Sequence, residues 1–270
     1  MLGKLFKYEF KNTGKVMLLV CVMLIVASIL GIADVRFLVT SSSQPSVLMS
    51  IVSACLLIAY FISLVASCII CYIYLMYHFF KTMFSEQGYL THTLPVKSLT
   101  TFHVKITTAA IWMFIISALV TLSVLMLMLV GFNLGPDFAA VMEELPAILE
   151  QTFGVSFGFV VVYMIFAIVL ACFAAPLMVA VCCCIGQLSN RHKITFSVVT
   201  GIAIYFIQQI VSLIASIILI LNVSPEQLEA GPQGDFSALL MNFSLGYALI
   251  TTAIYYVICN IIVRKHINLE

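Results

Sequence analysis

Hydrophobic and polar residues alternate along this chain in long blocks. Six runs contain no Asp, Glu, Lys or Arg, and they cover residues 16–33, 37–80, 106–136, 151–190, 194–225 and 236–263. A helix needs about 20 apolar residues to cross a hydrocarbon core of about 30 Å, so one span fits each run. We therefore expect an all-α membrane protein with six transmembrane helices, at about residues 16–36, 47–80, 105–132, 153–185, 194–222 and 238–263.

The second run is long enough for two spans. However, residues 53–71 contain no Pro, Gly or Asn on which the chain could turn. We therefore predict one long helix from Val47 to Phe84, which at ~1.5 Å per residue would be ~57 Å long. A transmembrane β-barrel is excluded, since its strands would alternate between apolar and polar residues.

The composition narrows the protein class further. Hydrophobic residues make up 63% of the 270 residues, charged residues 9%, and the mean hydropathy is +1.20. Soluble domains have about half apolar and a quarter charged residues, so a water-soluble globular protein is excluded. Disordered and nucleic-acid-binding chains need net charge or basic patches, so they are excluded too. We expect one transmembrane domain over residues 1–270.

The charged residues also predict the orientation of the spans. With six spans both termini lie on one side, and that side receives eleven of the twelve Lys and Arg residues. The opposite side receives eight of the eleven acids. Because Lys and Arg accumulate in cytoplasmic loops, both termini are predicted to be cytoplasmic.

The cysteines do not indicate a disulfide framework or a metal site. All nine fall within the predicted spans. Cys68 and Cys71 have the spacing of metal ligands, but without a second pair they are interpreted as packing residues. Acylation of Cys182, Cys183 and Cys184 near a cytoplasmic helix end is an alternative to packing.

Residues 1–14 have the pattern of an amphipathic helix. Lys4, Lys7 and Lys11 form a narrow stripe opposite a set of apolar side chains. Such a helix lies in the membrane interface with its lysines toward anionic headgroups. Gly14 would allow a bend into the first span. A basic start that only sets the topology is the simpler alternative.

Glu9 interrupts the apolar side of this helix. A carboxylate facing lipid is costly, so we expect this side to face protein and Glu9 to meet a donor. Arg191, Lys105 and a backbone amide are the candidates.

A second polar segment, residues 84–97, follows the long helix. Gly88 should end the helix, Pro95 should close a short apolar and polar piece, and Ser98 can cap the next helix. A short piece held between two helix extensions is the shape with which a membrane protein binds a cytoplasmic partner.

The opening MLGKLFKYEFKNTGK and the stretch FFKTMFSEQGYLTHTLPVK resemble the ABC-2-type permeases of Gram-positive bacteria. These are six-span subunits paired with a separate ATPase. The resemblance implies an elbow helix at residues 1–14, location in the bacterial plasma membrane, and a coupling helix that docks on the ATPase. The implied coupling residues are Glu86, Gly88, Tyr89, Leu90, His92, Thr93, Leu94 and Pro95. The family often has two acids before Gly-Tyr, whereas here Gln87 follows Glu86.

The energy source is predicted to lie in another chain. The sequence contains no Gly-x-x-x-x-Gly-Lys-[Ser/Thr] motif, so ATP and Mg²⁺ should bind to a partner ATPase, and no cofactor, metal or catalytic residue is expected here. The charge-free runs also lack the Asp, Glu or Arg of a proton relay, and all five histidines fall near predicted cytoplasmic ends. Sodium coupling through carbonyl oxygens stays open.

Polar candidates inside the spans are few. Gln208 and Gln209 lie at the centre of the fifth run and point about 100° apart, so at most one need face a pathway. Hydrogen bonding between helices is the alternative role. The outer loops are predicted at 133–151, with a surface-lying helical piece, and at 223–237.

Together with the resemblance, these features predict the permease subunit of an ABC exporter, and the resemblance implies a hydrophobic or peptide-like substrate of the antibiotic export or immunity type. Its expected partners are an ABC ATPase, the lipid membrane, and a second permease copy or a different six-span permease. Nucleic acid is not an expected partner. The alternative function is a six-span anchor or sensor that recruits a cytoplasmic partner without transport.

Overall fold

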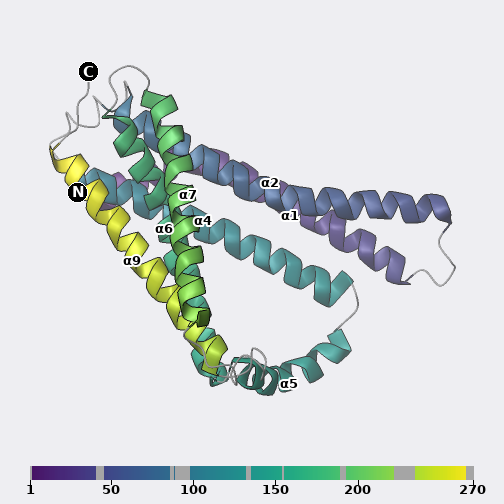
Figure 1. The fold of residues 1–270 in the computed structure, drawn as a ribbon. Coiled ribbons are helices and arrows are strands. Elements are labelled where there is room, and N and C mark those ends of the chain that lie inside the picture. The colour runs from purple at the N-terminus through teal and green to yellow at the C-terminus, as the bar shows by residue number, and fades with distance from the viewer. Residues whose placement is uncertain are drawn as a thin grey trace. The chain divides into compact units, whose positions relative to one another are not determined.

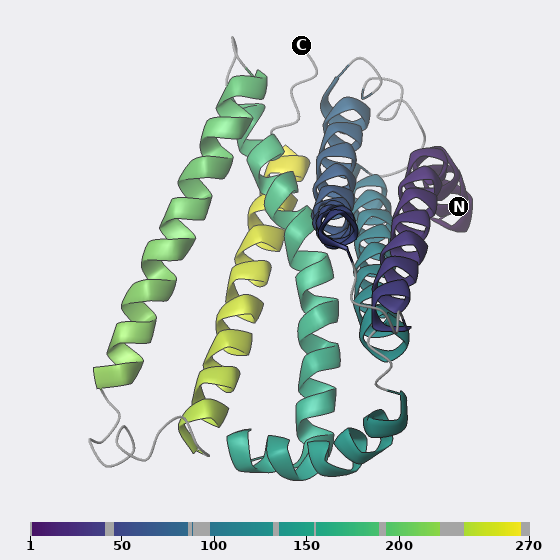
Figure 2. The same ribbon diagram turned by 90° about the vertical axis from the view of Figure 1, so that its right-hand side faces the viewer.

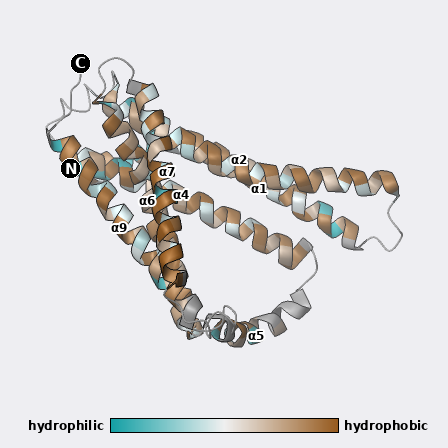
Figure 3. Ribbon diagram, in the orientation of Figure 1, coloured by the Kyte–Doolittle hydropathy of each residue, from teal (hydrophilic) through white to brown (hydrophobic). Residues whose placement is uncertain are grey.

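The structure, a computed structural model, describes residues 2–40, 46–85, 88, 98–131, 135–153, 155–188, 193–221 and 235–265 (Figure 1). Within these ranges the secondary structure is helical, and no strand occurs among them. The described residues thus confirm the predicted all-α class, and six of their helices are long and apolar enough to cross a membrane, the number that the sequence predicts. In Figure 3 most of the ribbon of these helices is coloured as hydrophobic.

The six spanning helices have the following bounds: α1 (Leu2–Thr40), α2 (Val47–Phe84), α4 (Ser98–Met126), α6 (Phe157–Gly186), α7 (Lys193–Leu221) and α9 (Asp235–Lys265). A π-helical turn, η1 (Leu127–Gly131), continues α4. The shorter α5 (Gly135–Phe153) occupies most of the first predicted outer loop, where a helical piece was expected. Of the second predicted outer loop, 223–237, residues 223–234 lie outside the described residues, and α9 begins at Asp235.

Helix α1 differs from the prediction at both ends. Residues 1–14 were expected to form a separate elbow helix, but Leu2–Thr40 is one continuous helix through Gly14. At its other end, α1 continues past residue 36, the predicted end of the first span, to Thr40. There, the Ser53 hydroxyl donates to Asp34 Oδ2 at 2.9 Å, and Arg36 Nη1 donates to the carbonyl of Val130 at 3.3 Å. Asp34 and Arg36 thus hydrogen-bond to α2 and η1 while the helix continues.

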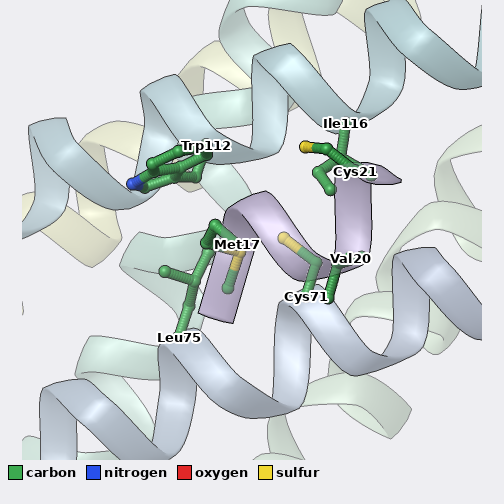
Figure 4. Close-up of a cluster of buried hydrophobic side chains, with 7 residues drawn as sticks. All are labelled: Met17, Val20, Cys21, Cys71, Leu75, Trp112 and Ile116. Atoms are coloured by element: carbon green, nitrogen blue, oxygen red, sulfur yellow. The ribbon is translucent and has the colours of Figure 1, made fainter. Parts of the chain in front are cut away.

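The helices divide into two compact units, one of residues 1–78 and 108–144, the other of residues 79–107 and 145–270. The first unit contains α1, η1 and most of α2 and α4. Its core includes two clusters of buried side chains. One is Met17, Val20, Cys21, Cys71, Leu75, Trp112 and Ile116, where side chains of α1 lie between α2 and α4 (Figure 4). The other is Leu24, Val35, Tyr60, Leu64 and Leu127.

Helices α1 and α2 approach each other closely at Gly31. A Cβ atom at this position would lie 2.8 Å from Cδ2 of Tyr60, so only glycine fits beside the ring. The Tyr60 hydroxyl lies 2.8 Å from Oγ of Ser123, which in turn donates to Oγ of Ser28 at 2.7 Å. This buried chain of hydroxyls connects α2, α4 and α1 inside an apolar core, where each group needs a partner.

The second unit is built around α6, which packs against both α7 and α9 (Figure 2). The C-terminal part of α6 is its most buried part, with Val181, Cys183 and Cys184 fully buried. Polar side chains connect α9 to its neighbours: the Tyr163 hydroxyl donates to the carbonyl of Met241 at 2.7 Å, and the Tyr247 hydroxyl donates to the carbonyl of Gln208 at 3.1 Å. The ends of α2 and α4 that flank residues 86–97 belong to this unit as well.

Candidate functional site

The predicted coupling segment joins the end of α2 to the start of α4. Helix α2 ends at Phe84, as the sequence predicts, and α4 begins at Ser98, the predicted cap. Of the segment itself the structure describes Phe84, Ser85 and Gly88. The amide of buried Gly88 donates to the carbonyl of Ser85 at 2.6 Å, so a turn follows directly on α2.

The other predicted coupling residues lie outside the described residues. They are Glu86, Tyr89, Leu90, His92, Thr93, Leu94 and Pro95. We call the last turns of α2 and the first turns of α4 the base of the coupling segment.

A buried lysine connects the two helices of this base. Lys105 Nζ on α4 donates to Oγ1 of Thr82 on α2 at 2.7 Å, and the two residues are 7% and 8% exposed. An ammonium group loses much hydration when it is buried, so its hydrogen bonds to protein are strongly held. This bond therefore fixes the end of α2 against the start of α4.

Aromatic rings reinforce the same connection. Phe79 of α2 contacts Phe102 of α4 edge to face, with ring centroids 6.2 Å apart, and Phe102 is 1% exposed. Phe84, the last residue of α2, contacts Phe79 in the same way at 5.9 Å. Edge-to-face pairs add about 0.5–1.5 kcal/mol each beyond the burial of their area. The two ends of the base are thus packed as one body.

The base continues to α9 through His103. Its ring stacks on Tyr256 at a centroid distance of 5.7 Å, and the Tyr256 hydroxyl lies 3.5 Å from His103 Nε2. Helix α4 therefore contacts α9 within a turn of Lys105. A displacement of the base would act on α9 as well as on α2 and α4.

The first turns of α1 form a second polar junction, inside the other unit. As predicted, Lys4, Lys7 and Lys11 are exposed, while Glu9 is half-buried and meets a side-chain partner. The partner is His78 of α2, whose Nε2 lies 2.8 Å from Glu9 Oε1.

The candidates proposed for Glu9 from the sequence did not include His78. Lys105 is bonded to Thr82 instead, and Arg191 lies outside the described residues. The sequence places His78 near the cytoplasmic end of the charge-free run 37–80, on the same predicted side of the membrane as Glu9. A contact between residues 69 positions apart, however, depends on how α1 and α2 pack.

Trp112, the single tryptophan of the chain, completes this junction and was not singled out in the sequence. Its Nε1 donates to Oγ1 of Thr13 at 3.0 Å, and its ring stacks on Phe10 at a centroid distance of 4.6 Å. A Cβ atom at Gly14 would lie 3.6 Å from this ring, an ordinary contact distance. We call Glu9, Phe10, Thr13, His78 and Trp112 the α1 junction.

The two glutamines proposed as pathway candidates have different surroundings. Gln208 is half-buried, and its backbone carbonyl accepts from the hydroxyl of Tyr247 on α9. Gln209 is exposed, and its Nε2 donates to the hydroxyl of Tyr205, one turn earlier on α7, at 3.1 Å. The structure thus places Gln208 toward the rest of its unit and Gln209 away from it.

The remaining titratable groups do not form a metal centre in the described part of the chain, where no three His, Cys, Asp or Glu side chains lie close enough to hold an ion. Cys68 is exposed, whereas Cys71 is buried. Cys182, Cys183 and Cys184 are all buried in α6.

Comparison with models of protein families, with curated proteins and with solved structures finds no match for this chain.

Proposed function

We propose that this chain is the membrane-spanning permease subunit of an ATP-binding-cassette exporter. ATP hydrolysis by a separate ATPase would drive efflux of a hydrophobic or peptide-like substrate, of the antibiotic export or immunity type. The chain would lie in the bacterial plasma membrane with both termini and residues 84–97 in the cytoplasm, in accord with the distribution of Lys and Arg.

The observation that supports this proposal most is the base of the coupling segment. Helix α2 has 38 residues and a length of about 57 Å, well beyond the roughly 30 Å of a hydrocarbon core. Its end is bonded to the start of α4 through Lys105 and Thr82 and through Phe79 and Phe102. A force on residues 86–97 would thus move two spans together, rather than bend a loop.

The N-terminal turns of α1 fit the role of the elbow helix in this proposal. Their exposed lysines suit a surface of anionic headgroups. The opposite side is held by the Glu9–His78 pair and by Trp112, so movement at the inner leaflet would reach α2 and α4.

The experiment that tests the proposal compares the wild-type chain with Leu94→Asp. The full chain, tagged, is purified from native membranes, and the bound ATPase is identified by its nucleotide-binding motifs. Its hydrolysis rate is then measured in detergent and in lipid. Leu94→Met serves as the control, because it keeps an apolar side chain of similar volume at the same position.

The expected result is a chain that folds in both variants but loses ATPase binding and stimulated hydrolysis only with Leu94→Asp. Equal binding and hydrolysis in both variants would contradict the proposal. A partner without nucleotide-binding motifs, or an ATPase whose rate does not respond to the chain, would instead favour the anchor or sensor.

A further inference from the structure

Three buried polar atoms at one end of the second unit have no hydrogen-bond partner in the protein. They are Nε2 and Oε1 of Gln187 and Oδ1 of Asn260. Nearly all buried polar groups in proteins are hydrogen-bonded, either to protein or to ordered water, so such exceptions need a physical explanation. A buried amide without partners costs free energy comparable to the hydrogen bonds that it lost on leaving water.

The two side chains lie beside the same contact between α6 and α9. The thiols of Cys184 on α6 and Cys259 on α9 are hydrogen-bonded to each other, and both residues are fully buried. Gln187 keeps helical backbone angles and follows Cys184 by three positions, which is one turn farther along the same side of α6. Asn260 directly follows Cys259. Both amides are therefore within one turn of the point where the two helices touch.

Helix α7 covers this point from a third direction. A Cβ atom at Gly201 would lie 3.5 Å from Sγ of Cys182, so α7 passes directly beside the last turns of α6. Ser197, one turn nearer the start of α7, is 2% exposed, and Gln187 is 6% exposed. Helices α6, α7 and α9 all belong to the second unit. The enclosed site is thus formed within one unit.

The three atoms need a partner that both donates and accepts hydrogen bonds. The oxygens of Gln187 and Asn260 accept, whereas Nε2 of Gln187 carries two hydrogens to donate. A cation would suit the oxygens but not the amide hydrogens, and an anion would suit only the hydrogens. Water meets both needs and is small enough to be enclosed. Buried waters typically make about three hydrogen bonds to groups that the protein leaves unpaired.

We infer that water is bound inside the second unit, between α6 and α9, at Gln187 and Asn260. One molecule donates its two hydrogens to Oε1 of Gln187 and Oδ1 of Asn260, and a second molecule accepts from Nε2 of Gln187. This site stands on burial and hydrogen-bonding chemistry alone and does not rest on the proposed function.

The position of this water matters for the base of the coupling segment. Tyr256, which stacks on His103 of the base, is one turn before Asn260 on α9. The hydrated contact thus lies at the level where a displacement of the base reaches α9. A water-mediated hydrogen bond is nearly as favourable as a direct one. Because a water molecule can shift with the helices, α9 can move slightly against α6 without leaving either amide unpaired.

Radiolytic labelling detects buried water directly. Short X-ray pulses split water into hydroxyl radicals, bound molecules included, and these radicals oxidise the sulfur atoms beside them. The full chain is irradiated in lipid bilayers, and the oxidised cysteines are located by mass spectrometry. Cys71 is the matched control, because it is 1% exposed in the first unit and lies among the apolar side chains of Met17, Leu75 and Trp112.

We expect Cys184 and Cys259 to be oxidised faster than Cys71, although all three are buried. This excess should be lost in Gln187→Leu. Oxidation of Cys184 and Cys259 at the rate of Cys71 in the wild-type chain would overturn the inference, and so would an excess that survives Gln187→Leu.

Thermal unfolding provides an independent measurement, because the sign of the effect differs between a hydrated and a dry site. With water bound, Gln187→Leu displaces it and leaves Oδ1 of Asn260 unpaired. The equilibrium constant for unfolding should then rise about five- to 150-fold, the range for one buried polar group without a partner. Adding Asn260→Leu removes the second amide and should recover part of the loss. At a dry site Gln187→Leu would remove a cost and raise the melting temperature, which would overturn the inference.

Discussion

The contact between Glu9 and His78 should couple the first turns of α1 to α2, and a double-mutant cycle measures that coupling. The variants are Glu9→Gln, His78→Leu and the two combined. Glu9 Oε1 and His78 Nε2 are 2.8 Å apart, and the side chains are only 16% and 13% exposed. Water therefore competes weakly for either group.

The magnitude follows from this geometry. A hydrogen bond that involves a charged group contributes about 1.5–3 kcal/mol, and coupling between residues in contact is about 0.5–3 kcal/mol. We expect a coupling energy of about 1.5–2 kcal/mol between Glu9 and His78. His78→Leu should cost more than Glu9→Gln, because it leaves a half-buried carboxylate without this partner, whereas a glutamine can still hydrogen-bond.

Trp112 provides the assay. It is the single tryptophan, and its ring contacts Phe10 and Thr13 one turn from Glu9, so its fluorescence reports the α1 junction directly. Unfolding is followed in mixed micelles with increasing SDS. Lys7→Gln, at an exposed neighbouring position, is the matched control and should change stability by less than about 0.5 kcal/mol.

The reasoning would be refuted by energies that simply add. If the double variant lost the sum of the two single losses, Glu9 and His78 would not interact in the folded chain. A Trp112 transition unchanged by His78→Leu would likewise show that the α1 junction forms without the pair.

Two further predictions concern the Lys105–Thr82 bond and the contact between Gly31 and Tyr60. Thr82→Val should destabilise the base by about 1–3 kcal/mol in thermal unfolding and lower ATPase stimulation, since it removes an acceptor from buried Lys105; an unchanged melting temperature would contradict this. Gly31→Ala should cost about 1–3 kcal/mol because its methyl group would collide with Tyr60. Gly158→Ala, where no atom lies within 4 Å of the added carbon, should be neutral or stabilising, so equal losses in both glycine variants would refute the steric argument.

The sequence predicted the spans well because the signal for them is one-dimensional. The absence of charge over a membrane's thickness identifies each helix without knowledge of its neighbours. The length of α2 followed from the same argument, since residues 53–71 contain no residue on which to turn. The base of the coupling segment was also located, through Gly88 and Ser98.

The continuity of α1 could not be predicted because it depends on neighbouring helices. Gly14 suggested a bend, but Trp112 packs over it in an intact helix. The error came from treating a local signal as decisive where a tertiary contact keeps the helix intact.

For the polar contacts too, the sequence predicted the local feature but not the tertiary partner. The orientation of Glu9 toward protein followed from helical periodicity within fourteen residues. Its partner His78 is 69 positions away, and the Lys105–Thr82 bond spans two helices. Periodicity indicates which side of a helix faces protein, whereas the identity of the partner requires the packing of the bundle.

The most direct test of the central claim measures the energy source in proteoliposomes. The purified chain is reconstituted alone or with its bound ATPase, and release of fluorescent hydrophobic peptides is followed under a proton gradient, a sodium gradient or ATP. We predict movement only with ATP and the ATPase together. Movement by the chain alone under an ion gradient would contradict the claim that residues 86–97 transmit the work of a partner.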